Sequence, residues 1–209
     1  MKLLSFEYQG RPGFGLLRGD AVVDLSQQGH ADLHAVLAAG ALPRLAELAA
    51  GLDATLPLAA LTLRPPIAAP GKIICVGVNY GNRNEEYKDG SAPPQYPSVF
   101  PRFPESFVGH GQPLLRPPES EQLDYEGEIA LVIGKAGRRI AAADAWSHVA
   151  GLTCLNEGTI RDWLRHGKFN VTQGKNWDAS GSMGPWLVTA DEFDPRAPLT
   201  VTTLSLIHI

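Results

Sequence analysis

The stretch Asp124-Tyr125-Glu126-Gly127-Glu128 leads directly into the apolar segment 129–133. In an extended strand, residues two positions apart lie on the same face, so the three carboxylates are predicted to point the same way. Like charges this close repel one another unless they are protonated, solvated or bridged by a cation. The stretch therefore predicts either a divalent metal site or a solvated strand edge.

The residues that follow favour the metal site, because they predict an interior strand. Ala130 and Val132 continue the acidic face and indicate that it runs into the core. The opposite face, which includes Leu131 and Ile133, is apolar as well. A strand that is apolar on both faces is typical of the interior of a sheet.

The composition excludes several classes of protein. The 209 residues allow one or two domains, and 44% hydrophobic with 19% charged residues is ordinary for a globular protein. A net charge of -4 provides no basic surface for nucleic acid. No apolar run approaches membrane-spanning length, and the first residues form no signal-like segment. We therefore expect a cytoplasmic protein with no nucleic-acid or membrane partner.

The two cysteines, Cys75 and Cys154, stand in apolar segments. They lack Cys-x-x-Cys spacing and a nearby histidine pair, so the sequence indicates neither a zinc site nor a disulfide framework. Both are predicted to be reduced core residues.

Residues 1–66 are predicted to form a small α+β domain. Three short strands joined by turns are expected first: Leu3 to Tyr8, Phe14 to Leu17 and Ala21 to Leu25. Two helices follow in the prediction, the first of them capped by Asp32. The proline-rich segment 64–70 is unsuited to a helix or a central strand, and it indicates the boundary of a second unit, residues 67–203.

Several motifs occur in order along this second unit. They are Lys72 to Tyr80, Phe100-Pro101-Arg102, Asp124 to Glu128, Gly151 to Asp162, and Gly174-Lys175-Asn176 followed by Gly184-Pro185-Trp186. Together they resemble the fumarylacetoacetate hydrolase family over roughly residues 72–203. The resemblance implies a mixed, mostly β catalytic fold, so the expected class of the chain is α+β, mostly β. It also implies a homodimer, a divalent cation and substrates that are 1,3-dioxo or 2-oxo acids.

The resemblance assigns three metal ligands. Glu126 and Glu128 match the Glu-x-Glu ligands of the family, and Asn156-Glu157 matches an Asn-Asp whose aspartate is the third ligand. Glu157 keeps a hard oxygen donor on a longer arm, which suits magnesium, manganese or calcium. Magnesium is the expected ion.

Other residues are assigned to the substrate and the chemistry. Lys175 matches the active-site lysine of the family and is suited to a substrate carboxylate or a developing enolate. Arg102 stands where many members have lysine and is expected to anchor a carboxylate. Asn79 and Tyr80, the last two residues of the first motif, are also expected to bind substrate. Arg161 and Asp162 are interpreted as a structural pair beneath the site.

One position departs from the family pattern. Hydrolytic members resemble Asn-Tyr-x-x-His-x-x-Glu, in which histidine and glutamate activate water. Here Glu86 keeps the glutamate position, while Arg83 replaces the histidine. Arginine stays protonated and is not a general base at neutral pH, although it can grip a substrate carboxylate. His166 is another candidate base, or an exposed bystander.

The preferred prediction is a metal-dependent hydrolase that cleaves a carbon–carbon bond of an acylpyruvate-like or fumarylacetoacetate-like acid. The metal would chelate the oxo acid and stabilise an enolate. The same enolate serves an isomerase, a tautomerase or a decarboxylase of a related oxo-diacid, and isomerisation requires no activated water. A binding or assembly module with a purely structural metal is the non-enzyme alternative.

Residues 204–209 are expected to be a non-native tail. The DNA sequence CTG TCT CTT ATA CAC ATC encodes them and matches a transposase end used in preparing sequencing libraries. On this hypothesis the chain is a C-terminally truncated member of the family. An inactive fragment that retains a structural metal site is then a further alternative.

Overall fold

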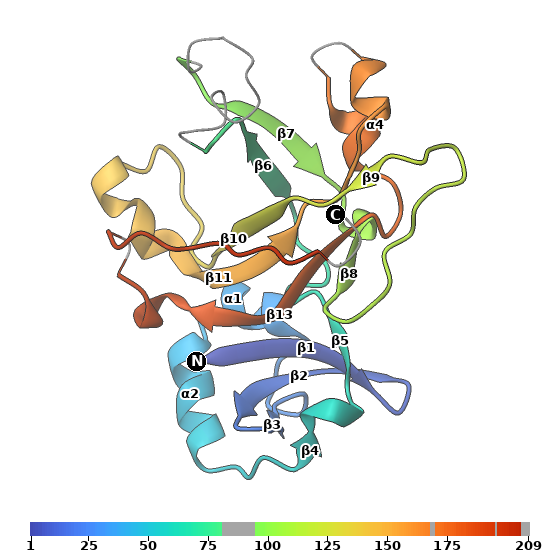
Figure 1. Cartoon of the computed structure of the whole chain (residues 1–209). Coiled ribbons are helices and arrows are strands. Elements are labelled where there is room, and N and C mark those ends of the chain that lie inside the picture. The colour runs from blue at the N-terminus through green and yellow to red at the C-terminus, as the bar shows by residue number, and fades with distance from the viewer. Residues whose placement is uncertain (81–94, 168–169, 195, 206–209) are drawn as a thin grey trace.

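Strands make up most of the regular structure. The computed structural model describes residues 1–80, 95–167, 170–194 and 196–205 (Figure 1). Its strands are β1 (Lys2–Tyr8), β2 (Arg11–Arg18), β3 (Ala21–Asp24), β4 (Leu56–Pro57), β5 (Thr62–Arg64), β6 (Ile73–Gly77), β7 (Ser98–Arg102), β8 (Phe107–Gly109), β9 (Leu123–Asp124), β10 (Gly127–Ile133), β11 (Val149–Asn156), β12 (Thr159–Ile160) and β13 (Gly181–Thr189). Its α-helices are α1 (Leu33–Ala38), α2 (Leu42–Ala50) and α4 (Thr172–Lys175). The predicted α+β, mostly β class is confirmed.

One nine-stranded sheet joins the beginning of the chain to its later part. The strand order is β10-β11-β13-β1-β2-β3-β4, with β5 also pairing with β1 and β8 with β13. The strands β1 and β13 are antiparallel, with Leu3 opposite Leu187. Residues 1–66 therefore share a hydrogen-bonded sheet with residues more than a hundred positions away. The division of the chain at residue 66 stays a prediction.

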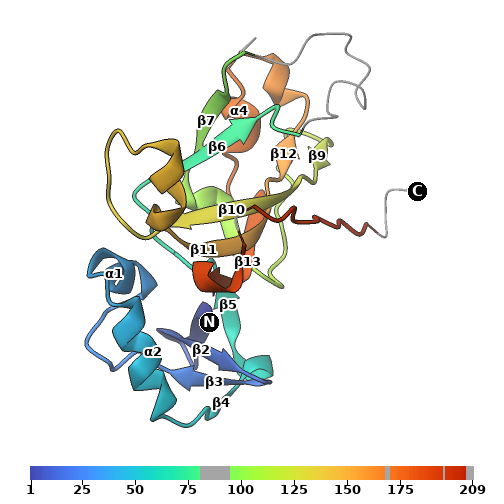
Figure 2. The same ribbon diagram turned by 90° about the vertical axis from the view of Figure 1, so that its left-hand side faces the viewer.

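The first 66 residues contain the predicted meander and two helices. The carboxylate of Asp32 caps α1 by accepting a hydrogen bond of 2.7 Å from the Ala35 amide. Helix residues pack with residues of β1, β2 and β3 in one buried cluster, which includes Leu33, Leu45 and Phe14. Figure 2 shows α1 and α2 beside these strands. Among the described residues, none of the helices is both long and apolar enough to cross a membrane.

The prediction of an interior strand after the acidic stretch is wrong. In the described part of the chain, β10 lies at the end of the sheet and pairs with β11 alone. Ala130 and Val132 pack against buried clusters, as the sequence indicated. On the other face, Leu131 and Ile133 are 54% and 63% exposed. The sequence pattern thus predicted the buried face of the strand correctly. The apolar residues on its second face, however, are exposed to solvent.

The core assignment of the cysteines is also partly wrong. Both thiols are free, as predicted, but Cys154 is exposed and Cys75 is half-buried. Cys154 lies in β11, where its two strand neighbours Thr153 and Leu155 are buried. Successive residues of a strand point to opposite faces, so the side chain of Cys154 lies on the face opposite to those of Thr153 and Leu155.

Two small sheets lie beside the large one. The strands β6 and β7 form one pair, and β9 and β12 form the other. In Figure 1, β6, β7 and α4 lie on the far side of β10 and β11 from β1 to β4. This arrangement brings the end of β7, the start of β10 and the end of α4 toward one place.

The contact between β11 and β13 requires a glycine. A Cβ atom added to Gly151 would lie 2.1 Å from the carbonyl oxygen of Val188 in the paired strand. We expect Gly151→Ala to lower the free energy of unfolding by about 1–3 kcal/mol, because the strands must separate to accommodate a methyl group. Urea unfolding monitored by circular dichroism measures this change.

Gly71→Ala is the matched control, since nothing lies within 4 Å of an added Cβ atom there. It is expected to leave stability unchanged or slightly raised. Equal losses in the two variants would contradict the close approach of β11 and β13.

Candidate active site

The acidic stretch divides between two sheets. Asp124 ends β9 and pairs with Thr159 of β12, whereas Glu128 lies in β10, which pairs with β11. Glu126 stands between the two strands, and its amide donates to the side-chain oxygen of Asn156 at 3.0 Å. Its carbonyl accepts a hydrogen bond of 2.8 Å from the amide of Glu157. These two hydrogen bonds hold the second acidic segment, Asn156-Glu157, against the first, Asp124 to Glu128.

Lys175, the last residue of α4, joins the two acidic segments. Its Nζ donates to Glu126 Oε2 at 2.9 Å, to Glu157 Oε2 at 2.7 Å and to Thr159 Oγ1 at 2.8 Å. An ammonium group has three N–H bonds, so each has an acceptor here. The lysine side chain is only 6% exposed. The ammonium therefore neutralises part of a carboxylate pair inside the protein.

Two arginines form further ion pairs, one with Glu126 and the other with Glu157. Arg161 Nε lies 2.8 Å from Asp124 Oδ2, and Arg161 Nη1 lies 2.9 Å from Glu126 Oε1. At the other end, Arg102 Nη1 lies 2.7 Å from Glu157 Oε1. The result is a row of six side chains whose charges alternate in sign. This charge row consists of Asp124, Arg161, Glu126, Lys175, Glu157 and Arg102.

Burial dominates the protonation of the site. It raises the pKa of Glu157 above its ordinary value, and the Lys175 ammonium offsets part of that rise. Burial also raises the pKa of Glu128, with the Tyr80 hydroxyl opposing the rise and the Glu126 charge adding to it. The thiol of Cys75 in β6 has its pKa raised to about 12, first by burial and then by the charge of Glu157. Ionised carboxylates are therefore costly here, and an added cation would favour them.

The three predicted metal ligands fit a hard divalent cation by their chemistry. Glu126 and Glu157 share the Lys175 ammonium, and the charge of Glu126 raises the pKa of both Glu128 and Glu157. Oxygen donors are what magnesium, manganese and calcium prefer. Across the residues that the structure describes, however, no three His, Cys, Asp or Glu side chains are gathered so as to hold a metal ion. The cation between Glu126 and Glu157 in this structure is the Lys175 ammonium.

Two hollows adjoin the acidic residues. The smaller, about 300 Å³, is lined among others by Asn79, Tyr80 and Glu128, so two of the three residues predicted to bind substrate lie beside a predicted metal ligand. Tyr80 Oη lies 3.2 Å from Glu128 Oε2 and 3.0 Å from the carbonyl oxygen of Gly127. The larger hollow, about 930 Å³, is lined by Glu128 and, among others, by residues 199–205. The non-native origin of residues 204–209 stays a prediction, and residues 206–209 lie outside the described part of the chain.

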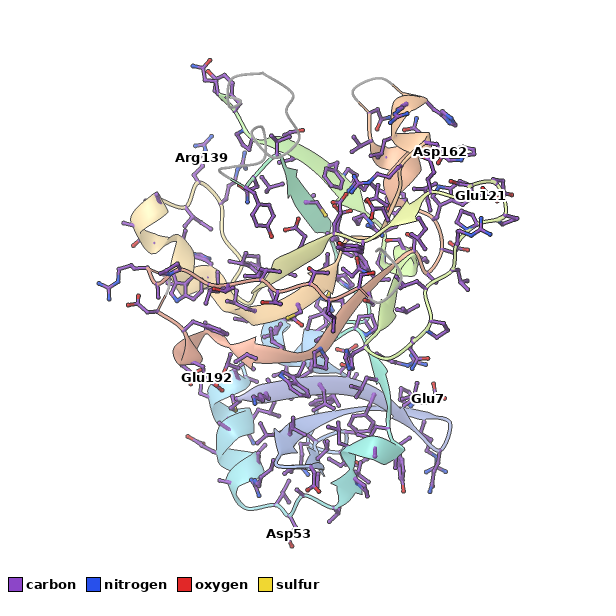
Figure 3. The ribbon with its side chains drawn as sticks, in the orientation of Figure 1. Glu7, Asp53, Glu121, Arg139, Asp162 and Glu192 are labelled. Atoms are coloured by element: carbon purple, nitrogen blue, oxygen red, sulfur yellow. The ribbon has the colours of Figure 1, made fainter. Side chains whose placement is uncertain are left out.

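Other predicted residues have different outcomes. Arg83 and Glu86 lie outside the described residues, so their roles stay predictions. The structural role of Arg161 and Asp162 stays a prediction: Arg161 forms ion pairs with Asp124 and Glu126, and the carboxylate of Asp162 accepts a hydrogen bond from Ser120 Oγ at 2.7 Å. Figure 3 labels Asp162 near the segment that carries α4.

Sequence reasoning missed two members of the site. Thr159 Oγ1 lies 3.0 Å from Glu126 Oε1 as well as against the Lys175 ammonium. The sequence analysis predicted no role for Thr159, which stands two residues after Glu157. Cys75 was assigned to the core because it stands among apolar residues, a pattern that cannot show which charged groups a strand approaches. His166, a candidate base, packs its ring against Trp163 at 4.6 Å between centroids.

Comparisons with known proteins find similarity over most of the chain. Residues 72–205 match the profile of the family described as fumarylacetoacetate (FAA) hydrolase, C-terminal. The chain is 38% identical over 178 residues to the mitochondrial oxaloacetate tautomerase FAHD2A of Bos taurus, covering 84% of this chain and 53% of that protein. It is 41% identical over 149 residues to the oxaloacetate tautomerase YisK of Bacillus subtilis, covering 70% of this chain and 49% of that protein.

A solved structure gives the same result for the fold. The maleylpyruvate hydrolase of Sphingobium sp. SYK-6, in complex with manganese(II) ion and pyruvate, superposes with a TM-score of 0.71 at 25% identity, over 93% of this chain and 70% of that one. The present chain spans about half the length of the curated relatives it matches. Since the family profile covers well over half of its residues, this chain belongs to the fumarylacetoacetate hydrolase family.

Proposed function

We propose that this site catalyses the keto–enol tautomerisation of a small 2-oxo diacid such as oxaloacetate, with a divalent cation bound. The observation that supports it most is the position of Lys175. Its ammonium is held against two carboxylates and a hydroxyl in a nearly buried place. Tautomerisation moves a proton between carbon and oxygen through an enolate, so it needs a cationic proton carrier beside groups that accept protons.

The two curated relatives support this reaction, since both are oxaloacetate tautomerases. The sequence adds a chemical reason. Hydrolysis needs an activated water, but Arg83 stands where the hydrolytic pattern has its histidine, and arginine is not a general base. None of the six side chains of the charge row is a histidine. Tautomerisation requires neither an activated water nor a histidine that activates it. We therefore prefer it to the hydrolysis that the family name suggests.

Hydrolysis of a carbon–carbon bond is the second candidate. It is favoured by the likeness to a maleylpyruvate hydrolase. Glu86 keeps the glutamate of the hydrolytic pattern, and its role stays a prediction. Decarboxylation of the same oxo-diacids would proceed through the same enolate.

Glu126, Glu128 and Glu157 would hold the cation. A divalent ion bound there would polarise the 2-oxo group and stabilise negative charge on its oxygen. Magnesium remains our expectation, while the ion in the related maleylpyruvate hydrolase is manganese. Within the chain, Lys175 Nζ would exchange one of its three acceptors for a substrate oxygen. Tyr80, in the hollow beside Glu128, would donate a hydrogen bond from its hydroxyl to the substrate.

Two broader expectations also stay proposals. A homodimer is expected from the family, and the small-molecule partner is expected to be an oxo acid. The cytoplasmic location stays a prediction, and the name of the Bos taurus relative places that protein in mitochondria.

The reaction is tested with enol oxaloacetate in the presence of magnesium. We expect the ultraviolet absorbance of the enol to decay faster with the protein than without it, with no change in mass. A chelator should abolish the acceleration. Release of pyruvate or of another smaller acid would contradict tautomerisation, and an acylpyruvate assayed in parallel identifies hydrolysis.

Glu126→Gln tests the site. The substitution removes one anionic oxygen donor and one partner of Lys175, so we expect kcat/KM to fall about 100-fold and manganese affinity to fall at least about tenfold. Isothermal titration calorimetry measures the affinity. Glu121→Gln, at an exposed position labelled in Figure 3, is the control and should change neither value. Unchanged manganese affinity in Glu126→Gln would contradict the metal site.

Tyr80→Phe tests the hollow. Loss of the hydroxyl beside Glu128 should lower kcat/KM about tenfold, since its proposed hydrogen bond to the charged substrate is lost. Manganese affinity should change less than it does in Glu126→Gln. Tyr96→Phe is the matched control, because Tyr96 is 75% exposed. An equal loss of activity in both tyrosine variants would exclude a specific role for the Tyr80 hydroxyl.

A further inference from the structure

We propose that Arg102 is a positioning residue that fixes Glu157 for the cation, and that it makes no contact with substrate. This inference deepens the proposed function and rests on it. It also replaces the sequence interpretation of Arg102 as an anchor for a substrate carboxylate. The two roles differ physically. An anchor needs free N–H groups that face the substrate, whereas a positioning residue donates its N–H groups to acceptors within the protein.

All five N–H bonds of the Arg102 guanidinium have acceptors inside the protein. Nε donates to Ser106 Oγ at 3.1 Å. Nη1 donates to Glu157 Oε1 at 2.7 Å and to the carbonyl oxygen of Gly158 at 3.2 Å. Nη2 donates to the carbonyl oxygen of Ser106 at 3.4 Å and to Ser180 Oγ at 3.2 Å. Guanidinium has five N–H donors, so none remains for a substrate.

The arginine side chain is also closed off from solvent. Its relative exposure is 0%, and that of its partner Glu157 is 6%. On one side the guanidinium carbon lies 4.4 Å from the ring centroid of Phe107. A substrate carboxylate would have to displace Glu157 to reach it, leaving a buried carboxylate without its arginine. Such an exchange is unfavourable, because a buried charge without a partner is strongly destabilising.

The contacts of Arg102 explain what it holds in place. They join the end of β7 to the turn at residues 157–158 and to Ser180, just before β13. The turn is tightly packed there, since a Cβ atom added to Gly158 would lie 1.9 Å from the carbonyl oxygen of Ser180. The carbonyl group of Gly158 and one carboxylate oxygen of Glu157 are therefore held by the same guanidinium.

The two oxygens of Glu157 then have different roles. Oε1 faces Arg102, while Oε2 faces Lys175. If Lys175 exchanged Oε2 for a substrate oxygen, Arg102 would still hold Oε1, and the Glu157 carboxylate would keep its orientation for a divalent cation. Residues that orient a metal ligand in this way typically contribute 10- to 100-fold in metal affinity or activity, an effect of about that size being expected here.

Arg102→Lys is the decisive variant. Lysine keeps the charge but lacks the planar fork of donors, so most contacts of the guanidinium are lost. We expect manganese affinity, measured by calorimetry without substrate, to fall at least about tenfold, and kcat to fall with it. The KM for oxaloacetate at saturating manganese should change less than about threefold. A KM raised tenfold or more with unchanged manganese affinity would show that Arg102 binds substrate and would overturn the inference.

Ser180→Ala provides a milder second variant if the lysine variant does not fold. It removes one acceptor of the guanidinium and leaves every charge in place. We expect manganese affinity to fall about two- to fivefold, again without a change in KM. Arg64→Lys is the matched control, since Arg64 is a half-exposed arginine that pairs with Glu7 at 2.7 Å. It should change neither quantity.

The outcomes separate this inference from the proposed function. Manganese binding without turnover in the unaltered protein would reject tautomerisation, while the affinities of the variants would still decide the role of Arg102. Turnover in the unaltered protein, with manganese affinity unchanged in Arg102→Lys and Ser180→Ala, would reject the positioning role alone. An unaltered protein that binds no manganese would overturn both.

Discussion

The interaction between Lys175 and the carboxylates of Glu126 and Glu157 determines how this part of the molecule can be built. Two carboxylates from separate segments lie in one largely buried place, and without a cation between them they would repel each other in a medium that screens poorly. The ammonium reaches both, and Thr159 accepts its third N–H. A buried ion pair recovers its desolvation cost only when geometry is good and the remaining hydrogen bonds are satisfied, and both conditions hold here.

Burial changes along the charge row, and with it the freedom of each member. At one end, Asp124 and Arg161 have 38% and 29% of their side chains exposed, so their pairing is weakened by water and salt. At the other end, Arg102 and Glu157 are almost completely buried. Lys175 lies between these two ends, and its side chain is as buried as that of Glu157. If Lys175 moves in the proposed reaction, the buried pair of Arg102 and Glu157 would be the part of the row that keeps its place.

The sequence predicted the class of the fold and its family, and it named the acidic residues and the lysine that the structure brings together. It did so because ordered motifs carry more information than any single pattern. The edge position of β10 could not be predicted, since apolar residues on both faces of a strand specify a preference for cover and not the presence of a neighbour. The ion pair of Arg161 with Asp124 could not be predicted either, because the two residues are far apart in the sequence and come together through the pairing of β9 with β12.

The placement of Cys75 has a consequence for the kinds of ion and oxidant that the site tolerates. A thiolate near Glu157 and Glu128 would favour soft ions such as copper(I) or zinc and would be open to oxidation by peroxide. With a pKa of about 12, the sulfur keeps its proton at neutral pH, and the thiolate is the form that binds metals and reacts. The same burial that makes the carboxylates costly to ionise therefore keeps this soft donor protonated. A soft ion would have to displace that proton before it could bind the sulfur, whereas a hard cation would bind carboxylate oxygens without that cost.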